Sequence, residues 1–169
     1  MTREYLEGSH GLQSDYHTYL EERFQGEVYG EALFGAMAEG CDDPVRVRKL
    51  RLLEQLERET KEFLLPLVME AGHSGEASQE RIAEGIHLGR QLAKVPWGEL
   101  LQGFQSELER FVLEFEQAEG LAPPGKRNLL RRVTDHERAL LDFSTREIEG
   151  DEPGALGAVV SILTEPPVV

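Results

Sequence analysis

Clusters of glycine and proline divide this chain into a few long segments that are rich in helix-forming residues. The clearest breaks are CDDP at 41–44, AGHSG at 71–75, KVPWGE at 94–99, GLAPPGK at 120–126 and GDEPG at 150–154. Glu, Leu, Ala, Arg and Gln dominate the stretches between these breaks. No segment alternates apolar and polar residues as a half-buried strand would. The chain is therefore predicted to be all-α.

The breaks place helices over about 14–39, 44–71, 78–119 and 126–149, and a short apolar helix within ALGAVVSIL at 155–163. Asp43 and Ser78 suit the N-cap positions of the second and third helices. Pro96 predicts a kink or a new start within the third. Long helices with short connections predict an antiparallel four-helix bundle with a short C-terminal helix. We expect one domain over 1–169, with its core at 14–150 and a loose lead-in at 1–13.

The charge of the chain limits its partners. The net charge is −14 and the pI is about 4.8, so a nucleic acid or an anionic membrane would be repelled. No apolar run reaches the length of a membrane span, and no basic region precedes an apolar one at the N-terminus. The single cysteine, Cys41, excludes an intramolecular disulfide framework. These features favour a cytoplasmic protein.

Acidic residues fall inside the apolar stripes of three predicted helices. On the first helix, Glu27 and Glu31 lie among residues such as Phe24 and Phe34 when successive residues turn by about 100°. The second and fourth stripes also contain polar residues; these are Glu57, Thr60, Glu137, Ser144 and Glu147, with His136 at the margin. The third stripe is nearly continuous and apolar, with only Glu107 at its edge. We expect Glu27, Glu31, Glu57 and Glu137 to be largely buried near the middle of the helices.

Burial of several carboxylates requires compensation, because one unpaired buried charge costs several kcal/mol. One hypothesis is a network of ion pairs and hydrogen bonds that includes Lys61, His136, Thr60 and Ser144. The other is a metal ion, whose positive charge allows carboxylates to converge.

The mid-helix glutamates resemble the pattern of the ferritin-like superfamily, which includes rubrerythrin-type di-iron proteins. That family carries a Glu on each of two helices and a Glu-x-x-His on each of the other two. Glu27 or Glu31 matches the first ligand. On the third helix, Glu107 is the one acid that lies near the apolar stripe. The segments Glu57–Thr60 and Glu137–Leu140 match the two motifs in their acids, but threonine and leucine replace the histidines. The resemblance covers about 14–150.

The resemblance implies a set of candidate metal ligands: Glu27, Glu31, Glu57, Glu137 and His136. Because both motif histidines are replaced, the preferred hypothesis is a binding or interaction protein without a standard di-iron centre. The alternative is a metal-dependent oxidoreductase or metal-binding protein with a degenerate iron or manganese site. A haem-oxygenase-like helical fold is a third possibility. The sequence identifies no small-molecule ligand.

Apolar residues off the core stripe of the first helix suggest an interface. Tyr19, Tyr29, Leu33 and Met37 would leave apolar area exposed, which predicts a homodimer through this helix. The alternative is that the N-terminal lead-in or the C-terminal tail covers them.

Overall fold

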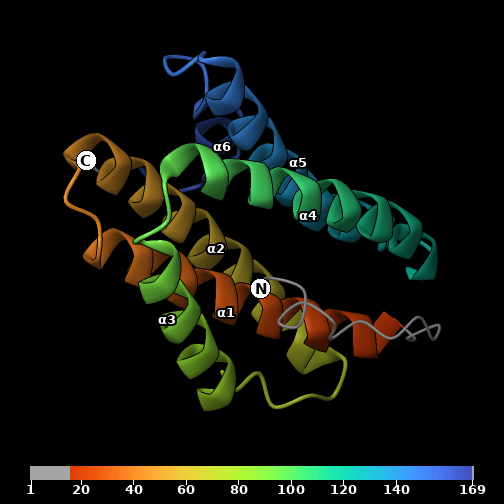
Figure 1. The fold of residues 1–169 in the computed structure, drawn as a ribbon. Coiled ribbons are helices and arrows are strands. Elements are labelled where there is room, and N and C mark those ends of the chain that lie inside the picture. The colour runs from red at the N-terminus through yellow and green to blue at the C-terminus, as the bar shows by residue number, and fades with distance from the viewer. Residues whose placement is uncertain (1–15, 169) are drawn as a thin grey trace.

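The computed structural model describes residues 16–168, and throughout them the only regular secondary structure is helical (Figure 1). The α-helices are α1 (Tyr16–Glu39), α2 (Pro44–Glu70), α3 (Gln79–Leu92), α4 (Trp97–Ala118), α5 (Arg127–Glu149) and α6 (Gly157–Ile162), and a 3-10 helix, η1 (Glu119–Leu121), follows α4. The all-α prediction is confirmed. Residues 14 and 15 of the first predicted helix lie outside the described residues.

Local sequence signals determine where several helices begin and end. The Asp43 carboxylate accepts hydrogen bonds from the backbone N–H groups of Val45 and Arg46, at 2.9 and 3.3 Å, and so caps α2. The Ser78 hydroxyl accepts one from Arg81 N–H at the start of α3. Gly150 ends α5 with φ of 82°, a conformation that favours glycine.

The third predicted helix is in fact two helices with different partners. After α3 ends at Leu92, α4 begins at Trp97 and packs against α5, whereas α3 packs against α1 (Figure 1). Pro96 explains the break, because proline lacks a backbone N–H group and disfavours helical geometry at Val95. Of the two outcomes expected at this proline, the structure shows the new start.

Two apolar clusters form the core, and a polar layer separates them. Along α1 one cluster extends to Val28 and the other begins at Leu33; along α2 they meet between Leu56 and Leu64. Along α5 the change falls between Val133 and Ala139. Five of the buried polar residues in these gaps or beside them form what we call the polar layer; they are Glu27, Glu57, Thr60, His136 and Glu137.

Most of the expected dimer surface is covered within one chain. Tyr19, Leu33 and Met37 are only 6 %, 7 % and 1 % exposed. Helix α3 lies against α1 because Gly85 and Gly89 let the two backbones approach: a Cβ atom at either glycine would lie 2.5 Å from a carbonyl oxygen of α1. Helix α3, which was not anticipated, lies against Tyr29 and Leu33, whereas Tyr19 packs against Phe115 of α4 with the ring centres 6.0 Å apart. Tyr29 remains half-buried. Most of the exposed area on which the dimer prediction rested is therefore covered within the chain.

Near the end of α5 the buried face carries Glu147, as predicted, and its side chain is 2 % exposed. Glu147 is held inside by an ion pair with Lys49 at 2.6 Å and by the indole N–H of Trp97, which donates to it at 2.9 Å. Helical periodicity also places Ile148 on the apolar stripe of this helix, but its side chain is 38 % exposed, because Glu147 is the residue that faces Lys49 and Trp97.

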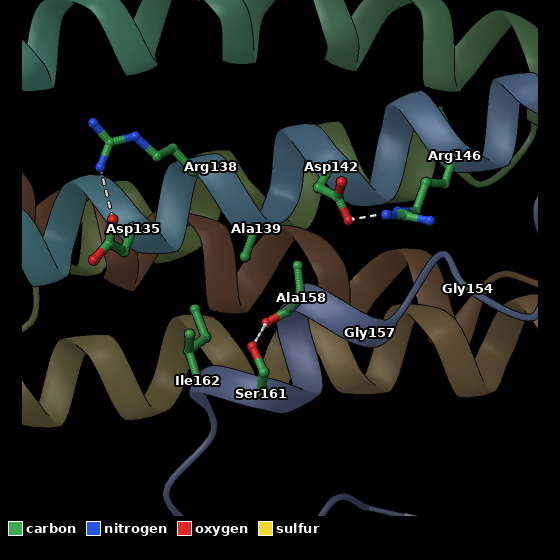
Figure 2. A pocket seen from close by; sticks show the side chains of 10 residues that line it. All are labelled: Asp135, Arg138, Ala139, Asp142, Arg146, Gly154, Gly157, Ala158, Ser161 and Ile162. Carbon is green, nitrogen blue, oxygen red and sulfur yellow. Dashed lines mark hydrogen bonds and ion pairs between the residues drawn. The ribbon is translucent and has the colours of Figure 1, made fainter.

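Helix α6 packs against α5, and a surface pocket of about 560 Å³ lies beside them (Figure 2).

No described helix between residues 16 and 168 combines the length and the apolar character needed to cross a membrane.

Candidate functional site

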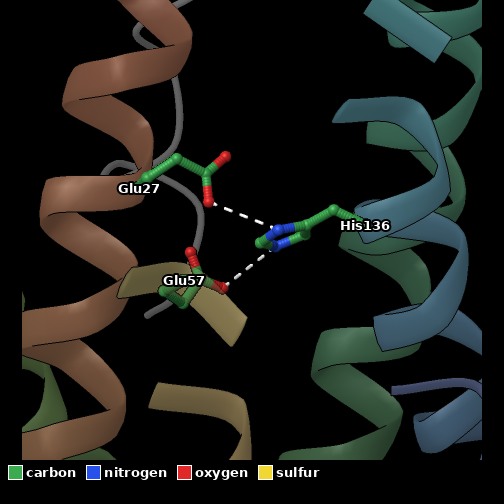
Figure 3. Close-up of side chains that lie close together, drawn as sticks. All are labelled: Glu27, Glu57 and His136. Carbon is green, nitrogen blue, oxygen red and sulfur yellow. Dashed lines mark ion pairs between the residues drawn. The ribbon is translucent and has the colours of Figure 1, made fainter. Parts of the chain in front are cut away.

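Three side chains of the polar layer converge from three helices. Glu27 of α1 and Glu57 of α2 approach the His136 ring of α5 from different sides (Figure 3). Glu27 Oε2 lies 3.4 Å from His136 Nδ1, and Glu57 Oε1 lies 3.3 Å from His136 Nε2. One carboxylate oxygen of each glutamate and one ring nitrogen of the histidine all lie within 4.8 Å of one another. We call these three residues the Glu–Glu–His cluster.

Thr60 orients the histidine of the cluster. Its hydroxyl lies 2.7 Å from His136 Nδ1, so the two groups are hydrogen-bonded. Position 60, where the pattern that the sequence resembles would carry a histidine, is a threonine, and the imidazole in contact with it comes from α5. His136, predicted at the margin of its stripe, is 1 % exposed.

Burial disfavours the charged form of every acid in this layer. Desolvation raises the pKa of Glu27 well above its ordinary value; His136 opposes this shift, and Glu57 and Glu137 add to it. Desolvation likewise raises the pKa of Glu57, with further repulsion from Glu137. The pKa of Glu137 is raised by desolvation and partly restored by His136 and Arg23. The Glu27 and Glu57 carboxyl groups are close enough to share a proton.

Two polar atoms of the cluster have no hydrogen-bond partner in the described residues. These are Glu27 Oε2 and His136 Nε2, both fully shielded from solvent. Their contacts within the cluster meet the distance for an ion pair but not the geometry of a hydrogen bond. Unsatisfied buried polar atoms are rare and require an explanation. A carboxylate oxygen and an imidazole nitrogen are both metal ligands, so the residues fit a divalent cation.

Gly30 of α1 leaves space for the Glu57 carboxylate, because it has no side chain. A Cβ atom at Gly30 would overlap the Glu57 carboxylate. The glycine therefore lets the acid of α2 reach past the backbone of α1 toward His136.

Not every predicted site residue joins the cluster. Glu27, Glu57 and Glu137 are buried as predicted, but the side chain of Glu31 is 25 % exposed and forms an ion pair with Lys61 at the edge of the layer. The prediction that Glu31 is largely buried is therefore wrong. Glu107 pairs with Arg110 on the surface of α4 at 2.9 Å. The Ser144 hydroxyl donates to the Leu140 carbonyl of its own helix and does not reach the cluster.

A pocket of about 400 Å³ leads from the surface to the cluster. Its floor contains the buried residues Thr60 and His136, and Leu56 and Ile162 provide apolar wall. The pocket thus connects the imidazole of the cluster with the surface between α2, α5 and the C-terminal segment.

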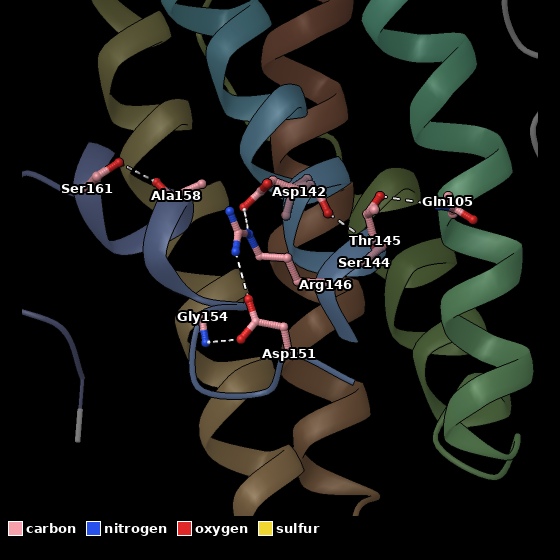
Figure 4. Close-up of polar contacts among 10 residues, drawn as sticks. Gln105, Asp142, Ser144, Thr145, Arg146, Asp151, Gly154, Ala158 and Ser161 are labelled. Atoms are coloured by element: carbon pink, nitrogen blue, oxygen red, sulfur yellow. Dashed lines mark hydrogen bonds and ion pairs between the residues drawn. The ribbon is translucent and has the colours of Figure 1, made fainter. Parts of the chain in front are cut away.

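The larger pocket beside α6 offers no comparable free groups. Its charged residues satisfy one another: Arg146 pairs with Asp142 and Asp151, and Arg138 pairs with Asp135 (Figures 2 and 4). The Ser161 hydroxyl donates to the carbonyl of Ala158 (Figure 4). This pocket therefore has no polar group that requires a ligand.

Sequence reasoning missed a second buried polar group on α2. Gln55 and Glu59 are 1 % and 6 % exposed, and together they hold residues 164–168. Glu59 accepts from the backbone N–H and the hydroxyl of Thr164, both at 2.6 Å. Gln55 accepts from Val168 N–H at 2.8 Å. A pattern within α2 cannot reveal this, because the partners lie more than 100 positions away.

Comparison of the chain with family models, with curated proteins and with solved structures found no match.

Proposed function

We propose that this chain is a metal-binding protein of ferritin-like architecture, with α1, α2, α4 and α5 as an antiparallel four-helix bundle. One divalent ion of the first transition row, such as iron(II) or manganese(II), is held by Glu27, Glu57 and His136. The pairing of α1 with α2 and of α4 with α5 supports the architecture. The unsatisfied Glu27 Oε2 and His136 Nε2 support the ion.

Those two unsatisfied atoms are the observation that carries the proposal. An ion between the three side chains would give both atoms a partner and would offset the repulsion between Glu27 and Glu57. A small inward movement would suffice, because the three ligand atoms already lie within 4.8 Å of one another. Of the two sequence hypotheses, this geometry favours the metal-binding one.

The ligand set supports a single ion in place of a pair. Glu31 is engaged by Lys61, and Glu107 by Arg110. Thr60 and Leu140 occupy the two motif positions where a di-iron site carries histidine. What remains is one imidazole and two carboxylates, a carboxylate-rich set suited to one ion. Such an ion would act as a Lewis acid toward a ligand that enters from the pocket above His136.

The residues around the ion have separate roles. Thr60 holds the imidazole through Nδ1, which leaves Nε2 as the ligand atom. The apolar clusters on both sides exclude water from the layer. Glu137 lies in the same buried layer, and an ion there would favour its ionised form, which burial alone disfavours.

The test measures Tm with and without added metal. The protein is purified without chelator, and its metal is then removed. Iron(II) or manganese(II) should raise Tm, since a ligand that binds only the folded state stabilises it by mass action. Glu57→Gln should abolish the increase, and Glu62→Gln, an exposed change on the same helix, should leave it intact. If no first-row ion binds stoichiometrically and Tm does not respond, the metal proposal is wrong.

A metal-free binding protein is the second candidate. The raised pKa values of Glu27 and Glu57 favour their protonated forms, and the two carboxyls can share a proton. The cluster can then remain buried without an ion. In that case chelator leaves Tm unchanged, and Glu57→Gln stabilises the protein.

A further inference from the structure

We infer that the 400 Å³ pocket above His136 is a binding site for a small organic carboxylate, with Arg132 and Asn128 as the residues that hold the carboxylate group. This inference goes beyond metal binding and does not depend on it. It rests on polar groups of the pocket rim, on α5, that have no role in the cluster.

The pocket has a buried floor and a polar rim. Thr60 and His136 form part of the floor, and both are buried. The rim contains exposed residues of the first turns of α5; these are Asn128, Arg131 and Arg132. A volume of about 400 Å³ lies within the range of small-molecule sites, roughly 300–1,000 Å³.

The charges in the pocket leave one guanidinium without an acid. Asp135 is engaged by Arg138 at 2.7 Å, and Glu59 is engaged by Thr164. Arg131 lies 3.6 Å from Glu119. Arg132 forms no ion pair with any residue in the described part of the chain. The pocket therefore offers one guanidinium that no acid of the described residues pairs with, while the Glu59 carboxylate is turned to the neutral donors of Thr164, Glu165 and Gln55.

Arg132 is also held in position. Its guanidinium carbon lies 4.1 Å from the centre of the Phe63 ring, and this contact restricts the side chain without using its N–H groups. The Asn128 amide, about one helical turn away on the same rim, has no hydrogen-bond partner among the described residues and can supply a further N–H donor. A carboxylate accepts two parallel N–H bonds from a guanidinium.

The rest of the wall defines the body of the ligand. Leu56 is 2 % exposed and Ile162 is half-buried, and both line the pocket. An apolar chain of a few carbon atoms would cover them, with its end near Thr60 and His136. The ligand class is therefore a short aliphatic carboxylate.

The experiment titrates hexanoate into the metal-free protein, with chelator present throughout, by calorimetry and by NMR of the histidine ring protons. We expect saturable binding that shifts the His136 resonances, and weaker binding of hexanamide, which lacks the negative charge. Arg132→Gln should weaken hexanoate binding by about tenfold, the loss expected for one charge-assisted hydrogen-bonding group.

Arg127→Gln is the matched control, because it removes the same charge from an exposed position in the first turn of α5, outside the pocket. It should leave hexanoate affinity within about twofold, as expected for a screened surface charge. Equal loss in both arginine variants, equal affinity for hexanoate and hexanamide, or no shift of His136 would each overturn the site. Because chelator is present, these results do not depend on whether an ion binds the cluster.

Discussion

Glu57 and Glu59 stand two residues apart on α2 and are equally buried, at 5 % and 6 % exposure, yet their chemistry is opposite. The pKa of Glu57 is raised well above its ordinary value by desolvation and by Glu137. Desolvation alone would raise the pKa of Glu59 as well, but hydrogen bonds from Thr164, Gln55 and Glu165 outweigh it, and the pKa is lowered.

The two acids differ in the number of hydrogen-bond donors that reach their carboxylates. Glu59 accepts three hydrogen bonds from Thr164 and Glu165 and one from Gln55. The nearest polar groups to Glu57 are another carboxyl and an imidazole nitrogen without a hydrogen-bond partner. Burial alone therefore does not identify a functional acid. A buried acid without donors is the one that needs an ion or a proton.

Removal of Glu59 should have the largest effect. Glu59→Ala leaves the Thr164 and Glu165 donors without their acceptor, and we expect a loss of about 3 kcal/mol in the free energy of unfolding. Urea denaturation at pH 7 measures this loss, with Glu62→Ala, an exposed change, as the control. A loss below about 0.5 kcal/mol, the range of ordinary surface changes, would show that the C-terminal segment does not stabilise the fold.

Neutralisation of Glu57 should have the opposite sign in metal-free protein. Glu57→Gln removes a buried charge and keeps its shape, so the free energy of unfolding at pH 8 should rise by about 1–2 kcal/mol. Glu59→Gln, the same chemical change two positions along, should lower it. The comparison between the two acids fails if both variants shift stability in the same direction.

The pH dependence of these variants should also differ. Glu57 has a folded pKa above its ordinary 4.5, so its contribution is full below that pH and is lost as pH rises through the folded pKa. Glu59 has a folded pKa below 4.5, so its contribution is full above that pH and is lost as pH falls through the folded value. The free energy of unfolding, measured from pH 3 to 8, should depend less on pH above 4.5 in Glu57→Gln. In Glu59→Gln it should depend less on pH below 4.5.

Substitutions at two glycines of α1 test whether the position of the Glu57 carboxylate depends on the space that Gly30 leaves beside it. Alanine at Gly26 meets nothing within 4 Å, so Gly26→Ala should stabilise the helix by about 0.5–1 kcal/mol. Gly30→Ala should lose that gain and weaken the metal-dependent rise in Tm, because the new methyl group displaces the Glu57 carboxylate. Equal stabilisation by both changes would mean that Glu57 moves aside freely.

The smallest effect is expected at the edge of the layer. Lys61→Met removes the partner of Glu31, but both side chains are 25 % exposed and solvent screens the pair. The expected loss is at most about 1 kcal/mol, and it should fall at high salt. A loss as large as that of Glu59→Ala would place Glu31 among the buried acids after all.

The helices could be predicted because their signals are local. Asp43, Ser78 and Pro96 each act on neighbouring backbone atoms, and their helix boundaries were predicted to within a few residues. The burial of Glu27, Glu57 and Glu137 followed from helical periodicity alone. The path of the chain after Pro96 could not be predicted in this way, because nothing local states whether α3 packs against α1 or α5.

The sequence predicted which acids contribute to the candidate site. It did not predict which residues those acids contact. The angle that placed Glu27 inside α1 also placed Glu31 there, since one turn changes the direction by only about 40°. The pairing of Glu31 with Lys61 depends on where α2 lies, and that is a tertiary property. The hydrogen bonds of Glu59 to Thr164 join residues 105 positions apart, so no local pattern contains them.

The close approach of α3 to α1 has a consequence for recognising relatives of this chain. Gly85 and Gly89 lie so near carbonyl oxygens of α1 that any side chain there would force the helices apart, whereas Gly98, Gly103 and Gly120 have open space around them. Mutational drift should therefore spare the first two positions and change the other three. A search pattern that requires glycine at 30, 85 and 89, together with an acid at 57, would find distant homologues even where the histidine has been replaced.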